Sequence, residues 1–87
     1  MPSTDTDRRT VHVTMTTADG HVSEVVRYER SGKFFLEAGQ TSKSEPTRTK
    51  LTLAEAVAFA GLPGARWHVG KPGGMRFDAG VRRIRNR

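Results

Sequence analysis

The chain has 87 residues, no cysteine and a formal net charge of +6, so it should form one small domain that buries only about 60% of its unfolded surface. The lack of cysteine excludes a disulfide framework and the thiolate ligands that most structural zinc sites use. No apolar stretch is long enough for a membrane-spanning helix or a secretory signal, so we expect a cytoplasmic protein that makes no membrane contact.

The first half of the chain predicts a three-stranded antiparallel meander. Residues 1–9 are polar and lack periodicity, so we expect them to be disordered. Apolar and polar residues alternate in Thr10–Thr17, and an Asp-Gly turn before Val22–Glu29 predicts a hairpin. Aromatic residues favour a third strand over Phe34–Ala38. The following segment, Gly39–Lys50, is polar throughout and predicts a solvated connection.

The next segment predicts a short helix that packs on this sheet. Thr52 provides an N-cap, and Glu55, three residues later, completes a capping box. Gly61 and Pro63 end the helix. The apolar stripe at helical spacing consists of Leu53, Ala56, Val57 and Ala60.

The last quarter predicts a second, shorter hairpin followed by a basic tail. Alternation favours strands over Arg66–Val69 and Met75–Asp78, joined by the glycine-rich loop Gly70–Gly74. We interpret this loop as a turn and not as a phosphate-binding loop, because Lys71 precedes a proline and the loop is expected to lead into a strand. Val81–Arg87 has two apolar residues three positions apart, which fits either one amphipathic helical turn or a flexible tail.

These elements predict a small single-domain α+β fold of order β-β-β-α-β-β. The helix packs on one face of the meander, and a short C-terminal hairpin completes the domain. The domain spans residues 10–80, between a disordered segment at residues 1–9 and a basic tail at residues 81–87.

The net charge is concentrated in the last quarter of the chain. Residues 66–87 hold seven basic residues against the single acid Asp78, whereas residues 1–65 hold eight residues of each sign and are neutral. A concentrated cationic end favours a partner with repeated negative charge, because a localised field raises its association rate and affinity. The candidate phosphate-contacting residues are Arg66, Lys71, Arg76, Arg82, Arg83, Arg85 and Arg87.

This charge predicts a small non-enzymatic protein that binds nucleic acid, preferably DNA, or has a regulatory role. Two alternatives remain open: a protein-interaction module, monomeric or homodimeric, for an acidic protein partner, and a tail that only solubilises the chain. No cofactor, metal or catalytic site is predicted, because His12, His21 and His68 are far apart in sequence and typical of surface or turn histidines. Tyr28 and Phe35 can share a sheet face, although aromatic residues in so small a core are more often structural.

Overall fold

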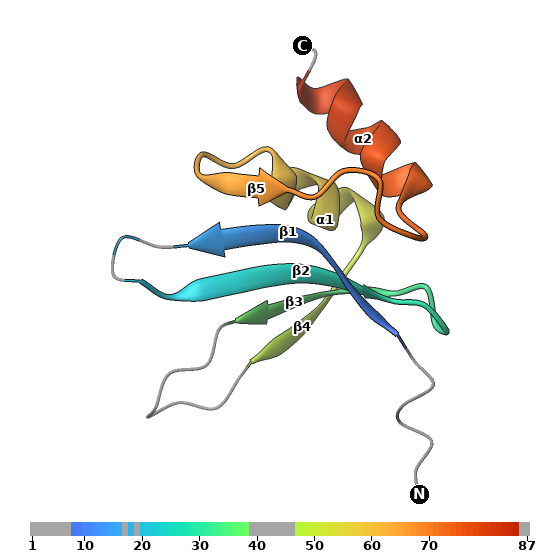
Figure 1. The fold of residues 1–87 in the computed structure, drawn as a ribbon, viewed down its shortest axis with the longest axis horizontal. Helices are drawn as coiled ribbons and strands as arrows, with labels where there is room; N and C mark the ends of the chain where they lie inside the picture. The colour runs from blue at the N-terminus through green and yellow to red at the C-terminus, as the bar shows by residue number, and fades with distance from the viewer. Residues whose placement is uncertain (1–7, 17, 19, 39–46, 86–87) are drawn as a thin grey trace, which may run out of the picture.

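The computed structural model describes residues 8–16, 18, 20–38 and 47–85. Within these residues the chain forms a small α+β fold, with one five-stranded antiparallel sheet and two helices that share a core with one of its faces (Figure 1). The elements in chain order are β1 (Arg9–Thr16), β2 (Val22–Tyr28), β3 (Phe34–Ala38), β4 (Arg48–Leu51), α1 (Leu53–Ala60), β5 (Ala65–Trp67) and α2 (Met75–Arg85). The strands lie in the order β4-β3-β2-β1-β5, so β2 is central. The predicted α+β class is confirmed, whereas the predicted order of elements is wrong in its second half.

The predicted meander is confirmed as β1, β2 and β3. The bounds of β3 are those predicted, and β1 and β2 differ from the predicted strands by one residue at one or both ends. Because β1 begins at Arg9, the prediction of disorder through residue 9 is wrong at that position; residues 1–7 lie outside the described residues. Gly20, from the predicted Asp-Gly turn, has a φ of 88°, which glycine adopts without steric cost.

A fourth strand, β4, pairs antiparallel with β3 and corrects the prediction of a solvated connection through Lys50. The pairing aligns Phe34 with Leu51 and Phe35 with Lys50. Leu51 alone is buried in this edge strand, so the apolar alternation that identifies a strand is missing from its sequence. Backbone pairing with β3 holds this segment in the sheet although its sequence has no apolar pattern. Residues 39–46 of the predicted connection lie outside the described residues.

Helix α1 forms where the capping box predicts it. The Glu55 backbone N–H donates to Thr52 Oγ1 at 3.1 Å, and the Thr52 N–H donates to Glu55 Oε1 at 2.7 Å. Ala56 and Ala60 are fully buried against the sheet, and Gly61 is the C-cap. The local sequence is therefore sufficient to place this helix.

The predicted C-terminal hairpin is wrong, because Met75–Arg85 is helix α2 and its predicted partner strand, β5, pairs with β1. Met75 and Phe77 fit a strand by alternation, but Met75 is 86% exposed and Phe77 is fully buried. Phe77 shares a helical face with Val81 and Ile84, at positions i+4 and i+7. The predicted tail at residues 81–87 is thus part of a helix up to Arg85; residues 86–87 lie outside the described residues.

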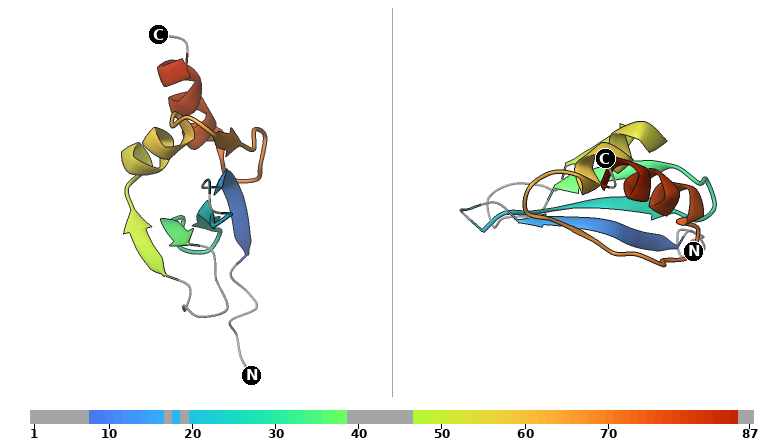
Figure 2. Two further views of the ribbon diagram at one scale, coloured as in Figure 1. Left: turned by 90° about the vertical axis from the view of Figure 1, so that its left-hand side faces the viewer. Right: turned by 90° about the horizontal axis from the view of Figure 1, so that it is seen from above.

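Two glycines set the close approach of α1 and α2, which Figure 2 shows side by side above the sheet. A β-carbon at Gly80 would lie 2.8 Å from Val57 Cγ2, and one at Gly61 would lie 2.9 Å from Ile84 Cδ1. Both distances are shorter than the contacts that β-carbons make, so a side chain at either glycine would require a shift of the neighbouring side chain or of the helix. Within the described residues, no helix is long and apolar enough to cross a membrane.

Candidate nucleic-acid interface

The apolar face of α2 and its one acidic residue both point into the protein. Phe77 and Val81 are fully buried in the core, and Asp78 is only 6% exposed. The Asp78 carboxylate accepts a hydrogen bond from Trp67 Nε1 at 2.9 Å and another from the Gly70 backbone N–H at 3.0 Å. The only acid of the last quarter is therefore engaged by hydrogen bonds within the protein and forms no ion pair with an arginine, although its edge lines the same depression as Arg82.

Three exposed arginines of α2 form what we call the arginine face: Arg76, Arg82 and Arg83. Arg76 and Arg83 are seven residues apart and share one side of the helix, and Arg82 lies about 100° further round. Among the described residues, no acidic side chain pairs with any of the three. Arg82 lies 5.8 Å from the centroid of the Trp67 ring. These cations are consequently available to an external anion.

Lys71 extends this face from the loop that precedes α2. It is exposed, and it lines with Arg82 a shallow depression of about 320 Å³. The loop leads into a helix, which corrects the expectation of a strand. The turn interpretation still fits, because Gly70 and Gly73 have φ of 80° and 75°. The Gly74 N–H donates to Lys71 O, so this amide and that of Gly70 already have acceptors within the protein.

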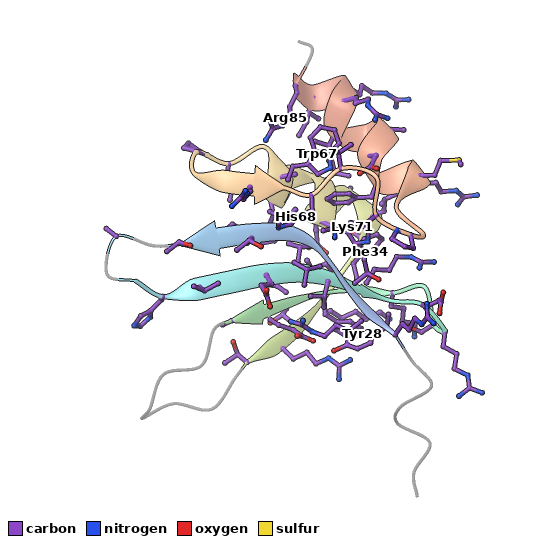
Figure 3. All side chains as sticks on the ribbon, viewed as in Figure 1. Tyr28, Phe34, Trp67, His68, Lys71 and Arg85 are labelled. Atoms are coloured by element: carbon purple, nitrogen blue, oxygen red, sulfur yellow. The ribbon has the colours of Figure 1, made fainter. Side chains whose placement is uncertain are left out.

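Two other predicted contact residues are placed differently. Arg85 donates to the Ala60 carbonyl oxygen at 3.0 Å and lies 5.4 Å from the Trp67 ring centroid, so it fastens α2 to the end of α1 (Figure 3). Arg66 pairs with Thr14 across β1 and β5, and it therefore projects from the sheet face opposite to the helices. Arg87 lies outside the described residues.

The sheet face opposite to the helices, which we call the open face, carries the predicted aromatic pair. The Tyr28 and Phe35 ring centroids are 5.6 Å apart, which confirms that these residues share a face. The Arg48 guanidinium lies 4.6 Å from the Tyr28 centroid and 4.3 Å from that of Phe35. The rings are covered by this cation, as expected for structural aromatic residues.

The charges beside these rings are paired with each other. Arg9 donates to Glu24 at 2.6 Å and to Glu37 at 2.8 Å, and the Tyr28 hydroxyl donates to Glu37 at 2.5 Å. Burial would raise the pKa of Glu37, but the hydrogen bonds from Tyr28 and Arg9 outweigh it and lower that pKa. Burial and the hydrogen bond to Glu37 raise the pKa of Tyr28. In this part of the open face, the Arg9 guanidinium is therefore paired with carboxylates of the same face.

His12 lies in the core, so the prediction that it is a surface or turn histidine is wrong. A bulge in β1 between Val11 and Val13 lets His12 join Val13 on the buried face, although strict alternation would expose it. Its ring is fully buried between Phe34 and Phe77, with centroid distances of 5.7 and 5.1 Å. A bulge has no signal in the alternation pattern, so the sequence could not reveal this position.

The His12 side chain has no hydrogen-bond partner within the described protein for either ring nitrogen. Burial is the main cause that lowers its pKa; the charge of Asp78 opposes this effect, and Arg27, His68 and Lys71 add to it. The other histidines are placed differently, since His21 is exposed and His68 Nε2 lies 2.8 Å from Thr14 Oγ1. No cluster of three or more metal-ligating side chains occurs in the described part of the chain.

The geometry thus brings together Lys71 and the arginine face and leaves Arg66 and Arg85 outside this group. Guanidinium and ammonium groups that form no ion pair within the protein can hold phosphate oxygens through charge-assisted hydrogen bonds. Comparisons with protein-family models, curated proteins and solved structures gave no match for this chain.

Proposed function

We propose that this protein binds nucleic acid, and DNA in preference, through Lys71 and the arginine face of α2. The observation that carries the proposal is that the side chains of three exposed arginines of one helix form neither an ion pair nor a hydrogen bond within the described residues. Arginine recognises phosphate in a planar, bidentate geometry. The helix has 11 residues and is therefore about 16 Å long, and a helix of ordinary diameter fits the major groove of duplex DNA.

The proposed interface is smaller than the basic quarter of the sequence. Arg85 is held by Ala60 and Trp67, and Arg66 projects from the open face, so neither supports a contact made by α2. Three or four phosphate contacts give an affinity whose logarithm falls with the logarithm of salt concentration at a slope of about −3. Binding of this kind is sequence-independent in its main energetic term and fits a non-enzymatic, regulatory role.

The test compares two double variants that remove the same charge. Arg82→Gln with Arg83→Gln removes two cations of the arginine face, whereas Lys50→Gln with Arg66→Gln removes two exposed cations from the open face. Fluorescence anisotropy with a labelled DNA duplex is measured over a salt series. We expect the first variant to reduce the magnitude of the salt slope by about 2 and the second to leave it nearly unchanged.

Two outcomes would contradict this proposal. An equal loss in both variants would mean that only net charge matters, and an absence of binding to duplex and single-stranded nucleic acid at low salt would reject the function itself. Binding of an acidic polypeptide at the same residues with higher affinity than DNA would favour the acidic protein partner.

A further inference from the structure

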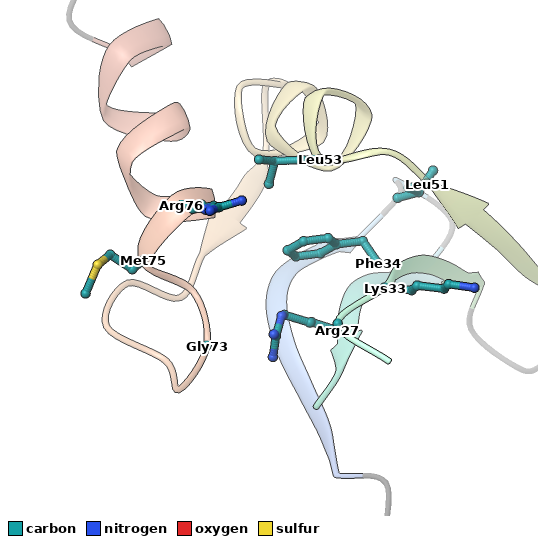
Figure 4. A pocket seen from close by; sticks show the side chains of 9 residues that line it. Arg27, Lys33, Phe34, Leu51, Leu53, Gly73, Met75 and Arg76 are labelled. Atoms are coloured by element: carbon teal, nitrogen blue, oxygen red, sulfur yellow. The ribbon is translucent and has the colours of Figure 1, made fainter. Parts of the chain in front are cut away.

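A groove opens at one end of the sheet, where the β2–β3 turn meets the first residues of α1 and α2 (Figure 4). Its volume is about 530 Å³, within the range of roughly 300 to 1,000 Å³ that is usual for small-molecule sites. The groove is distinct from the arginine face, with which it shares only Arg76.

The groove has an apolar floor and an apolar rim. The ring of Phe34 and the side chain of Leu51 form the floor, and both are largely buried. Leu53, from the first turn of α1, is 39% exposed on the rim and faces Arg76 across the opening in Figure 4. A ligand with an apolar body would cover this surface and remove it from water.

Three basic residues, Arg27, Lys33 and Arg76, also line the groove, and no acidic residue does so among the described ones. None of the three forms an ion pair within the described part of the chain. The lining therefore combines apolar contact area with uncompensated positive charge.

Arg27 is the most informative of these cations. It lies on the central strand β2, two residues after the fully buried Val25 and opposite the buried Phe34, so it occupies a half-buried position on the face that the helices cover. Core-facing positions of a central strand are ordinarily apolar, since a partly desolvated cation without a partner is unfavourable. An anion bound in the groove would supply that partner.

Gly73 leaves room for the Arg27 guanidinium. A β-carbon at Gly73 would collide with Arg27 Nη1, whereas one at Gly32 would make only an ordinary van der Waals contact, 3.5 Å from Nη2. Figure 4 shows the guanidinium next to the backbone of the loop that contains Gly73. The backbone of the loop before α2 thus packs directly against the cation and limits its orientations, which reduces the entropy that is lost when a ligand binds.

We propose that this groove binds a small organic anion whose apolar body rests on Phe34, Leu51 and Leu53 and whose carboxylate or phosphate pairs with Arg27 and Arg76. Neither half of such a ligand suffices alone, because the floor offers contact area and the arginines offer charge. The groove shares Arg76 with the proposed nucleic-acid interface, but it does not require that function, and the binding is measured without nucleic acid.

The test uses four probes with the full chain. Octanoate and octyl phosphate carry both features, octanol carries only the apolar chain, and inorganic phosphate carries only the charge. Amide chemical shifts locate the binding, and calorimetry gives the affinity. We expect octanol and inorganic phosphate to bind at least about tenfold more weakly than the two anionic octyl compounds, and the stronger of the two anions identifies the head group.

Substitutions in the groove then test which side chains bind the head group of the ligand. Arg27→Met keeps an apolar stem and is expected to weaken octanoate binding by about tenfold, whereas Arg27→Lys retains part of the affinity. Leu53→Glu puts a carboxylate opposite Arg76 at the first turn of α1, where helices accept acids, and is expected to abolish binding while the fold is retained. Lys50→Met on the open face is the charge-matched control and should bind like the wild type.

The proposal is overturned if octanol binds as tightly as octanoate, if Arg27→Met leaves the affinity unchanged in a folded variant, or if the shifts lie away from the groove. Binding of a short acidic peptide in the absence of any octanoate binding would also overturn it, in favour of a segment of a partner protein.

Discussion

The open face of the sheet and the arginine face of α2 both contain several arginines, but the arginine side chains have different partners on the two surfaces. On the open face, Arg9 contacts two carboxylates and Arg48 lies over two aromatic rings. On α2, neither Arg76 nor Arg83 has an acidic partner in the described residues. The difference teaches that a count of basic residues does not locate a binding surface; what matters is which cations lack a partner within the protein and also lie together on one element.

Asp78 forms its hydrogen bonds inside the protein and therefore no ion pair with an arginine of α2. Its removal has the largest expected effect on the free energy of unfolding. Asp78→Ala leaves Trp67 Nε1 and the Gly70 N–H without their acceptor, so the free energy of unfolding should fall by about 3 kcal/mol. Denaturant titration followed by Trp67 fluorescence measures the loss. The salt slope of DNA binding should change little in the folded variant; an unchanged stability would show that Asp78 does not hold α2.

The second test removes an acidic residue from the open face. In Glu37→Gln, Arg9 and Tyr28 lose a charged acceptor, and we expect the free energy of unfolding to fall by about 1 to 2 kcal/mol. Because the pKa of Glu37 is lowered in the fold, its contribution is present above about pH 4.5 and is lost as the pH falls through the folded-state pKa.

The same acids allow a sharper test with DNA. Glu24→Gln combined with Glu37→Gln leaves Arg9 and Arg48 without acidic partners in the described residues, but the salt slope should stay nearly unchanged, because both arginines lie on the open face and not on α2. An increase of the slope magnitude by about 1 to 2 would show that arginines of the open face also bind DNA once their acidic partners are removed.

The buried His12 predicts a pH dependence of stability near neutrality. Its lowered pKa means that stability is complete above about pH 6.5 and decreases as the pH falls from there to the folded-state pKa. The slope cannot exceed about 1.4 kcal/mol per pH unit, since one proton is involved. Thermal or denaturant unfolding across this range measures it. His12→Leu should remove the slope, and a slope that persists in this variant would assign it to another group.

The smallest expected effects come from two arginines of α2 that differ only in their contacts. Arg85→Gln loses the hydrogen bond to the Ala60 carbonyl and should reduce the free energy of unfolding by about 0.5 to 1 kcal/mol, with little change in the salt slope of DNA binding. Arg83→Gln should show the reverse: nearly unchanged stability and a salt slope smaller in magnitude by about 0.9. Equal effects of the two variants on both measurements would contradict the distinction between held and available arginines.

The second half of the fold shows why the alternation of apolar and polar residues does not by itself distinguish a strand from a helix. Met75 and Phe77 satisfy a period of two, and Phe77 and Val81 satisfy a helical period, so a segment this short fits both. The contact of Gly80 with Val57 and the hydrogen bonds of Asp78 decide for the helix, and both depend on residues distant in the chain. Strand β4 was missed because an edge strand with one buried residue has no apolar pattern.

By itself the sequence determined the features that depend on near neighbours: the three strands of the meander, the capping box that starts α1 and the concentration of charge in the last quarter. Tertiary structure alone decided which of those charges are free. Whether an arginine meets a carbonyl, an aromatic ring, a carboxylate or solvent depends on which distant segments pack beside it, and no local pattern records that. For the same reason only the folded chain reveals that His12 is buried and that Arg27 lines an apolar groove.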